Sequence, residues 1–271
     1  MENDYRHRQI RLEKVHCVSE EHFDRLVAQL PLRPGQRLLD AGSAYGAVTQ
    51  AVLQRQPPAG VHYHLLEQSA VQLAEAKDQL QARQGTEWVQ THAAFYNESI
   101  LAPSPPPGSY HMIVAKLLWH EIARADQPQL ARILYDLLAP GGRLVLWQIT
   151  LDEAIGDFYR DIIRKKDALA GYPTLVAQRH FPNESELLGQ LQAAGFAQIE
   201  HADRLEYHFD SSTRLATDFR GDAAKQADWE GFIRQRAGEL APVTLAQLHY
   251  ADPGDRVEMY FEWGLYVAQK A

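Results

Sequence analysis

The sequence predicts an α/β protein built on a mostly parallel, doubly wound sheet. Short apolar segments typical of strands alternate with segments of helical periodicity from residue 37 to residue 149. The connections between them are short, which favours parallel strands joined by right-handed crossovers. The segment 143–149 is an almost unbroken apolar run, as expected for a strand that is buried on both faces.

The first helix is expected to begin after Ser19, a suitable N-cap, and to reach residue 30. Asn183 and Glu186 form a capping box before another helix that Gly195 ends. Further helices are expected at 45–54, 70–84, 127–138 and 152–169. Strands are expected at 37–40, 61–66, 87–91, 110–115, 143–149, 196–209 and 257–267, the last with strict apolar alternation.

Composition and charge narrow the class of protein. The chain has 271 residues, of which 45% are hydrophobic and 23% charged, as in ordinary globular proteins. The net charge is −8 and no dense Lys/Arg cluster occurs, so nucleic acid is not an expected partner, because its binding depends on phosphate neutralisation. The single cysteine, Cys17, and the lack of a long apolar run or secretory signal predict a cytoplasmic protein that does not enter a membrane. The sequence leaves open whether the protein forms a homo-oligomer.

The order and spacing of the expected helices and strands also predict how the chain is divided into a cap, a main domain and insertions. Residues 1–30 are expected to form an N-terminal helical cap or lid, and residues 31–271 one main domain. Two helical insertions, at about 151–180 and 210–254, interrupt this domain and are expected to face the substrate.

The residues from Asp40 to Gly46 carry the strongest functional signal. An acidic residue ends the first strand, and a loop of small residues with Gly42 and Ser43 leads into a helix. Such a loop lets backbone groups approach a ligand closely. A dinucleotide fold would need Gly-x-Gly-x-x-Gly at this place, and the sequence lacks the matching glycines, so that alternative is weak.

Four segments together resemble class I S-adenosylmethionine-dependent methyltransferases. They are Leu-Leu-Asp-Ala-Gly-Ser-Ala-Tyr-Gly at 38–46, Leu-Leu-Glu-Gln-Ser at 65–69, Ala-Pro-Gly-Gly-Arg-Leu-Val-Leu at 139–146 and Leu-Gln-Ala-Ala-Gly-Phe at 191–196. The resemblance spans residues 37–200 and 256–269 and implies a seven-stranded sheet in the order 3-2-1-4-5-7-6, with strand seven antiparallel. One departure is Ala44, where the family usually has a further glycine.

The resemblance implies S-adenosyl-L-methionine as the cofactor and assigns residues to it. Asp40 would lie beside the methionine end, and Glu67 after strand two would accept both ribose hydroxyls with its forked oxygens. The other assigned residues are Gly42, Ser43, Gly46, Gln68 and Lys116. After strand three the family often has an acid that contacts adenine. Here His92 takes that place, with Ala93 and Phe95 beside it. Two alternatives stay open: His92 or Phe95 stacks on adenine, or His92 is a surface loop residue.

Methyl transfer needs alignment of a nucleophile, and a base only when that nucleophile starts protonated. His120 follows strand four in Leu-Trp-His-Glu and is the leading candidate base, with a merely packed or orienting histidine as the alternative. We expect a small organic acceptor, methylated on oxygen or nitrogen rather than carbon. The residues expected to bind it are Tyr5, Trp119, Tyr159, Tyr172, His180 and Trp229.

Other chemistries have less support. His120 and Glu121 lack the second histidine of a zinc protease, and His62 with His64 lack a third ligand, so no metal is expected. No Gly-x-Ser-x-Gly elbow marks a hydrolase. Two alternatives stay open: a cyclase or decarboxylase on the same cofactor-binding scaffold, and a non-catalytic cofactor-binding protein.

Overall fold

The computed structural model describes residues 17–55 and 60–271, apart from the side chains of residues 153 and 154. Tyr5 and residues 1–16 of the expected lid therefore lie outside the described residues. None of the helices in these ranges combines the length and the apolar character needed to cross a membrane.

A seven-stranded sheet in the described residues has the order β3-β2-β1-β4-β5-β7-β6, which confirms the order implied by the resemblance. Strands β1 to β5 pair in parallel, and β7 runs antiparallel to both β5 and β6. The strands are β1 (Arg37–Ala41), β2 (His62–Leu66), β3 (Ala93–Tyr96), β4 (Tyr110–Lys116), β5 (Leu138–Ile149), β6 (Ala197–Asp210) and β7 (Glu258–Gln269).

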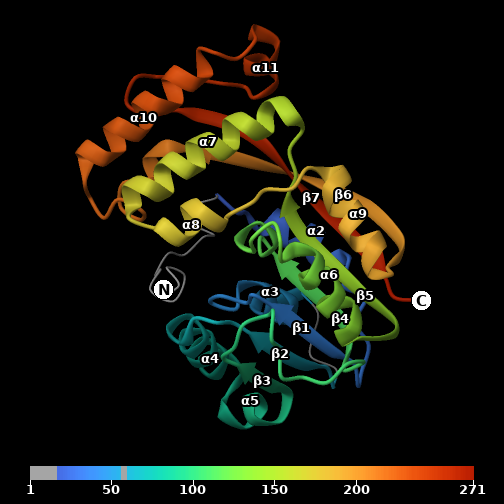
Figure 1. Cartoon of the computed structure of the whole chain (residues 1–271). Helices are drawn as coiled ribbons and strands as arrows, with labels where there is room; N and C mark the ends of the chain where they lie inside the picture. Colours follow the sequence, from blue (N-terminus) through green and yellow to red (C-terminus); the bar gives the residue numbers. More distant parts are fainter. Residues whose placement is uncertain (1–16, 56–59) are drawn as a thin grey trace.

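Helices cover both faces of this sheet, as the doubly wound prediction requires (Figure 1). One face packs on α2 (Glu20–Ala28), α3 (Ala47–Arg55), α4 (Ala70–Gln84) and α5 (Thr86–His92). The other face packs on α6 (Gln127–Leu137) and α9 (Glu184–Ala194). Ser19 caps α2 with a reciprocal pair of bonds, in which its backbone N–H donates to Nδ1 of His22 and its hydroxyl accepts from the backbone N–H of His22.

The strand expected at 87–91 is wrong, because residues Thr86–His92 form helix α5. A five-residue segment with a single buried apolar residue, Val89, is compatible with both the helical and the strand periodicity. The helical choice brings Trp88 and His92, four residues apart, into a stack with ring centroids 5.0 Å apart. Strand β3 then occupies only Ala93–Tyr96, which moves its carboxyl end several residues along the chain.

Two smaller expectations also change. The strand expected at 143–149 begins earlier, because β5 starts at Leu138 and shifts register before Arg143 pairs with Met112. The capping box of α9 is half formed: Asn183 accepts from the backbone N–H of Glu186 at 2.8 Å. The Glu186 carboxylate contacts Arg124 and His180 instead of returning to the cap, because charged donors compete for it.

Strands β6 and β7 extend beyond the rest of the sheet. Ile149, the last residue of β5, pairs with Trp263, whereas β6 and β7 continue to pair as far as Asp210 with Glu258. This ribbon carries a group of helices that we call the cap (Figure 1). The cap consists of α7 (Glu153–Ala170), α8 (Pro173–Gln178), η3 (Ser211–Arg214), α10 (Ala223–Ala237) and α11 (Pro242–Gln247). Both expected insertions are thus helical, and they lie on the side of the sheet where the parallel strands end.

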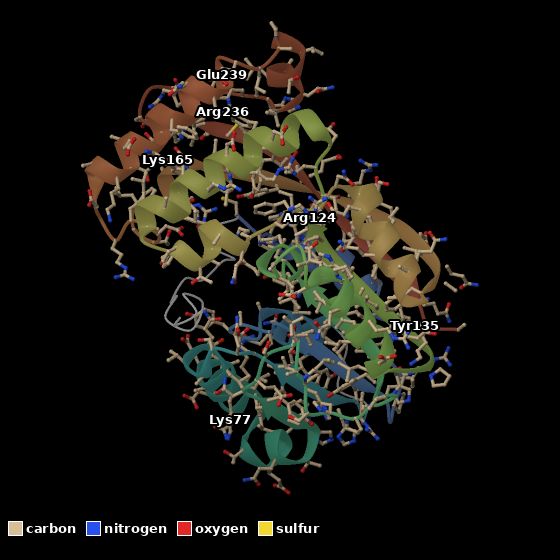
Figure 2. All side chains as sticks on the ribbon, viewed as in Figure 1. Lys77, Arg124, Tyr135, Lys165, Arg236 and Glu239 are labelled. Atoms are coloured by element: carbon tan, nitrogen blue, oxygen red, sulfur yellow. The ribbon has the colours of Figure 1, made fainter. Side chains whose placement is uncertain are left out.

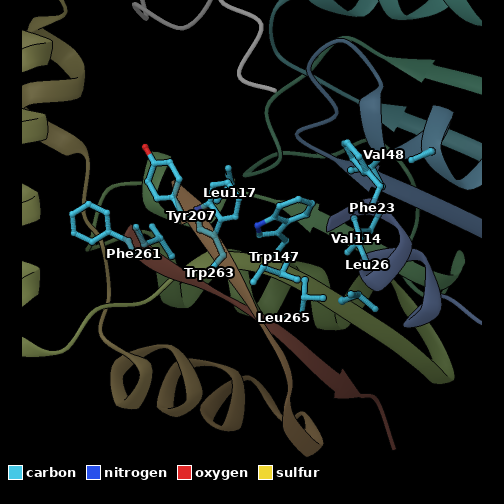
Figure 3. Packing of buried hydrophobic residues seen from close by; sticks show 14 of the residues in the cluster. Phe23, Leu26, Val48, Val114, Leu117, Trp147, Tyr207, Phe261, Trp263 and Leu265 are labelled. Carbon is cyan, nitrogen blue, oxygen red and sulfur yellow. The ribbon is translucent and has the colours of Figure 1, made fainter. Parts of the chain in front are cut away.

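The cap and helix α4 lie at opposite ends of the molecule (Figure 1). In Figure 2, Lys165, Arg236 and Glu239 lie on the cap, and Lys77 lies at the opposite end on α4. Between them, one large apolar cluster joins α2 and α3 to the sheet and to the base of the cap (Figure 3). The cap is therefore packed onto the sheet by a continuous core.

Candidate active site at the carboxyl edge of the sheet

A cavity opens at the carboxyl ends of β1, β2 and β4, where ligands bind in doubly wound folds. It contains about 960 Å³ of empty space, counting the part that is open to solvent. Its polar lining residues are Asp40, Ser43, Tyr45, Glu67, Gln68, Gln72, Glu98, Ser99, Lys116 and Glu121. Six of the predicted cofactor residues therefore come together there, namely Asp40, Gly42, Ser43, Glu67, Gln68 and Lys116.

The loop after β1 turns through three residues in the left-handed region: Gly42 (φ 68°), Ala44 (φ 47°) and Gly46 (φ 75°). A Cβ on Gly42 would lie 2.9 Å from Cδ1 of Leu118, so both the backbone and the space require glycine. Ala44 holds the same conformation at the place of the family's usual glycine, at a cost of about 1–2 kcal/mol. A Cβ on Gly46 would instead meet Ala76, so Gly46 serves packing and does not line the cavity.

The loop amides are occupied inside the protein. The N–H groups of Gly42 and Ser43 both donate to the carbonyl of Leu66, at 2.9 and 3.1 Å, and that of Ala44 donates to Oε2 of Glu67 at 3.0 Å. The Ser43 hydroxyl is buried and has no hydrogen-bond partner in the described residues. Since buried polar groups are nearly always paired, this hydroxyl is available to a ligand.

Asp40 lies at the base of the cavity and is almost fully buried. Its Oδ2 accepts from the backbone N–H of Thr49 at 3.1 Å and from the Thr49 hydroxyl at 2.8 Å. Burial raises the pKa of Asp40 to about 6, although the Thr49 bonds and the charge of Lys116 act in the opposite direction. Neutral donors therefore hold most of this carboxylate, and a cationic ligand would stabilise its ionised form.

Glu67 directly follows β2, as predicted, and connects two loops. Its Oε2 accepts from Ala44, and its Oε1 accepts from the backbone N–H of Ser69 at 2.8 Å. Burial raises the pKa of Glu67, and these backbone bonds lower it. No basic side chain is paired with it in the described residues.

The acid after β3 is Glu98, which the sequence reasoning missed. It lines the cavity, and its Oε1 accepts from the backbone N–H of Ser104 at 2.7 Å. The reason for the error is the position of β3: the expected strand at 87–91 put His92 at the carboxyl end, whereas His92 precedes β3 at its amino end. Counting from Tyr96 would have found Glu98.

The other residues expected near adenine lie away from the cavity. His92 stacks between Trp88 and His62. Ala93 opens β3, and the Phe95 ring lies 5.8 Å from Nζ of Lys77. None of these three lines the cavity.

His120 is buried behind the cavity and does not line it. Nε2 of Gln148 donates to the carbonyl of Ile149 at 3.1 Å and lies 3.0 Å from Nδ1 of His120. A carbonyl only accepts, so the Gln148 nitrogen also donates to Nδ1, and the His120 proton resides on Nε2. That Nε2 lies 3.3 Å from Oε1 of Glu121.

The role expected for His120 as a base is therefore not supported. Both ring nitrogens are engaged, and the ring stacks on Phe181 with centroids 4.6 Å apart. Burial lowers the pKa of His120, which keeps it neutral. The neighbouring Glu121 is the residue of this segment that reaches the cavity.

Glu121 also begins a chain of buried charges that runs into the cap. Arg179 donates to both of its oxygens, at 3.3 and 2.5 Å, and to Oδ2 of Asp167 at 2.7 Å. Lys166 lies between Asp167 and Asp218, at 2.8 and 2.9 Å. Arg214 completes the chain 3.3 Å from Asp218. The chain, defined as Glu121, Arg179, Asp167, Lys166, Asp218 and Arg214, contains three acids and three bases, all at most 8% exposed.

The residues expected to bind the acceptor are engaged in packing. Trp119 donates its indole N–H to Gln190, and Trp229 donates to the carbonyl of Ile162. Tyr159 packs edge-on against Phe181 and Phe261. Tyr172 is buried at the start of α8, and His180 contacts Glu186 at 3.0 Å. None of these five lines the cavity.

His62 and His64 were also considered as metal ligands from the sequence and were set aside. Within the described ranges no three His, Cys, Asp or Glu side chains are grouped so as to hold a metal ion. His62 stacks on His92, and His64 contacts Tyr110 at 3.0 Å.

Together, the sheet order and the acidic cavity at its switch point define a doubly wound α/β fold with a cavity at the carboxyl edge of its sheet. Residues 39–144 match a sequence model described as a methyltransferase domain. This match and the fold confirm the resemblance to class I S-adenosylmethionine-dependent methyltransferases, and they agree with S-adenosyl-L-methionine as the predicted cofactor. No curated protein matches the sequence.

Solved structures with the same fold share little sequence with this chain. The YcgJ protein of Bacillus subtilis is 15% identical, with a TM-score of 0.75 over 93% of this chain and 99% of that chain. A putative methyltransferase of Bacillus halodurans is 16% identical, with a TM-score of 0.73 over 92% and 99%. A phosphoethanolamine N-methyltransferase of Haemonchus contortus, in complex with S-adenosylhomocysteine, is 16% identical, with a TM-score of 0.54 over 91% and 52%.

The residues that line the cavity also fit S-adenosyl-L-methionine by their chemistry, independently of the sequence match. The Ser43 hydroxyl is a buried group without a partner in the described part of the chain, and Gly42 keeps the loop close to Leu118. The acids Asp40, Glu67 and Glu98 outnumber the single lysine of the lining, Lys116. An acidic cavity suits a ligand that carries a sulfonium and an ammonium group.

Proposed function

We propose that this protein transfers a methyl group from S-adenosyl-L-methionine to an oxygen or nitrogen of a small-molecule acceptor. The observation that carries the proposal is the cavity, in which Asp40 lies near the carboxyl end of β1, and Glu67 and Glu98 follow the neighbouring strands β2 and β3. By their positions, Asp40 would hold the methionine end, Glu67 the ribose hydroxyls and Glu98 the adenine amino group.

When bound, the cofactor supplies a methyl carbon that is already activated by its sulfonium. The protein then has to position the acceptor and exclude water, and positioning contributes about 7–11 kcal/mol to the lowering of a barrier. The link between the cap and the cavity is Arg179, which directly follows α8 and donates to Glu121 on the cavity lining.

Glu121 replaces His120 as the residue that we expect to orient the acceptor. Its carboxylate lines the cavity, and the guanidinium of Arg179 fixes both of its oxygens. Each carboxylate oxygen can accept more than one bond, so Glu121 can still accept from an acceptor hydroxyl or amine. This arrangement favours nucleophiles that carry a proton.

A transfer assay tests the proposal. The protein is incubated with S-adenosylmethionine labelled on its methyl group and with a panel of small phenols and amines, and both labelled product and S-adenosylhomocysteine are measured. We expect acceptor-dependent formation of both. Conversion of an acceptor without S-adenosylhomocysteine would support a cyclase or decarboxylase instead, and cofactor binding without any turnover would support a non-catalytic protein.

A further inference from the structure

The segment that carries Glu121 into the cavity is too short to be stable alone. It is the 3₁₀ helix η2 (Trp119–Glu121), which follows β4 and has only three residues. A single turn of this kind forms few hydrogen bonds of its own, so its position depends on contacts with other elements. Glu121 and the next residue, Ile122, both line the cavity. The contacts that fix η2 therefore also fix this wall of the cavity.

One buried side chain, that of Gln127, contacts both ends of η2. Gln127 is the first residue of α6 and is 0% exposed. Its Nε2 lies 3.1 Å from the carbonyl oxygen of Trp119 and 3.2 Å from that of Ile122. Carbonyls only accept hydrogen bonds, so the amide must present its nitrogen to them, which fixes the orientation of this side chain. A single amide therefore holds the first residue of η2 and the residue that follows its end.

The same amide nitrogen also holds the segment that carries Arg179. It lies 2.9 Å from the carbonyl oxygen of His180, and the backbone N–H of His180 donates to the carbonyl of His120 at 3.1 Å. Arg179, the preceding residue, donates to both oxygens of Glu121. Gln127 thus joins the two backbone segments that carry the Glu121–Arg179 pair and keeps them in register.

A closed ring of hydrogen bonds fixes Gln127 in turn. The indole N–H of Trp119 donates to Oε1 of Gln190 on α9 at 2.8 Å, and Nε2 of Gln190 donates to Oε1 of Gln127 at 3.3 Å. Gln127 then donates to the carbonyl of Trp119, the residue at which the ring starts. Helices α6 and α9 pack side by side (Figure 1). The ring therefore connects η2 to two packed helices, and a satisfied polar network of this kind favours one arrangement.

We propose that Gln127 is a positioning residue of the acceptor site. It does not line the cavity, and it acts through η2 by keeping the carboxylate of Glu121 directed at the methyl group of the bound cofactor. Groups that orient a reacting molecule have to be held within about 0.5 Å of the productive geometry by surrounding residues. This role rests on the proposed function, because it requires that Glu121 contacts the acceptor.

Two adenosyl ligands report on the position of Glu121 without any acceptor. S-adenosylhomocysteine lacks the methyl group, and sinefungin carries an ammonium group at the place of that methyl. A carboxylate that faces this place attracts the ammonium, so the ratio of the two affinities reports on how Glu121 is placed. Calorimetry on the parent protein and on Glu121→Gln gives the reference. We expect Glu121→Gln to weaken sinefungin binding about tenfold and to leave S-adenosylhomocysteine binding unchanged.

Substitution of the amide tests the positioning role. Gln127→Met keeps the length of the side chain but removes the donor from both ends of η2, and we expect it to weaken sinefungin binding by about the same tenfold. S-adenosylhomocysteine should bind as it does to the parent protein. Gln129→Met changes an exposed glutamine of the same helix, and this matched control should keep both affinities. Gln127→Met should not change the ratio further in Glu121→Gln, because it acts through that carboxylate.

A second variant covers the case in which Gln127→Met does not fold. Gln190→Met breaks the ring on the side of α9 and leaves the three carbonyls bonded to Gln127. We expect it to lower the affinity for sinefungin by about threefold, a smaller loss than that caused by Gln127→Met. An unchanged ratio in Gln190→Met would then overturn the role of the ring.

The two ligands separate this role from the proposed function. If S-adenosylhomocysteine fails to bind the parent protein, both fall. If it binds and Glu121→Gln leaves the ratio unchanged, Glu121 does not face the methyl position, and the positioning role is overturned while the methyltransferase proposal stands. The same conclusion follows if Gln127→Met weakens both ligands equally, because Gln127 would then be only structural.

Discussion

The cavity and the cap both bury carboxylates, but they hold them in different ways. In the cavity, Asp40 accepts from Thr49, and Glu67 accepts from two backbone amides, so neutral donors hold both charges. In the cap, Lys166 contacts both Asp167 and Asp218. The cap therefore neutralises itself, whereas the cavity keeps an excess of negative charge that is available to a cationic ligand.

This difference has an energetic reason. A buried charge without a partner is costly, and burial raises the pKa of Asp40 to about 6. This arrangement does not stabilise the folded protein by itself, but it stabilises the binding of a positively charged ligand. In the cap, alternating charges connect α7, the end of α8 and the segment after η3, so they favour one arrangement of these elements.

The largest effect is expected from breaking the buried chain. Lys166→Met would leave Asp167 and Asp218 without their shared cation and should lower the free energy of unfolding by about 3–5 kcal/mol. The control is Lys165→Met, because Lys165 pairs with Asp228 on the outer side of the cap, where both side chains are at least 30% exposed. That pair contributes about 0–1 kcal/mol. Urea unfolding measures the free energy of unfolding of both variants. Equal losses in the two variants would contradict the difference between the buried chain and the exposed pair.

A smaller effect concerns pH and the cavity. Because the pKa of Asp40 is raised to about 6, a cationic ligand that favours the ionised form must displace a proton at low pH. Affinity for S-adenosylmethionine should therefore rise about tenfold between pH 5 and pH 7. Calorimetry over this range should show the rise in the parent protein and a flatter profile in Asp40→Asn.

The same shift predicts the sign of a stability change. The folded state holds the Asp40 proton more tightly than the unfolded state, whose pKa is near the ordinary value of 3.8. The contribution of Asp40 to stability is therefore greatest below about pH 4 and is lost as the pH rises to about 6. At pH 7.5 Asp40→Asn should unfold at higher urea concentration than the parent while binding the cofactor more weakly. A loss of both properties would indicate that Asp40 is structural.

The smallest effect is expected in the loop after β1. Ala44→Gly removes the strain of a left-handed alanine and should raise the free energy of unfolding by up to about 1 kcal/mol. Gly42→Ala introduces the same strain and a Cβ 2.9 Å from Leu118, so it should lower stability by at least as much. Thermal unfolding of the two variants should give shifts of opposite sign.

The sequence predicted the features that local patterns decide. Strand ends follow from apolar runs, so the places of Asp40 and Glu67 at the ends of strands were predicted from the pattern, and the resemblance to the family assigned both to the cofactor. Strand β3 was misplaced because its four residues, Ala93–Tyr96, are all only half-buried and leave a weak signal. That error of register put His92 where Glu98 belongs.

The cap could not be predicted in the same detail. Glu121 and Arg179 lie 58 residues apart in the chain, and no local sequence pattern predicts that they pair. The spacing of Trp229 shows that it is part of a helix but not that its indole is bonded to Ile162. His120 looked suitable as a base because the bonds that occupy both of its nitrogens form only in the fold.

The most direct measurement is the affinity of S-adenosylmethionine for Glu67→Gln, obtained by calorimetry at pH 7.5. Asp78→Asn, an exposed acid on α4, is the matched control. If the unpaired carboxylates of the cavity hold the cofactor, Glu67→Gln should bind at least tenfold more weakly, since bonds to charged groups contribute about 1.5–3 kcal/mol, and Asp78→Asn should bind like the parent. Equal affinity of all three proteins would contradict the account.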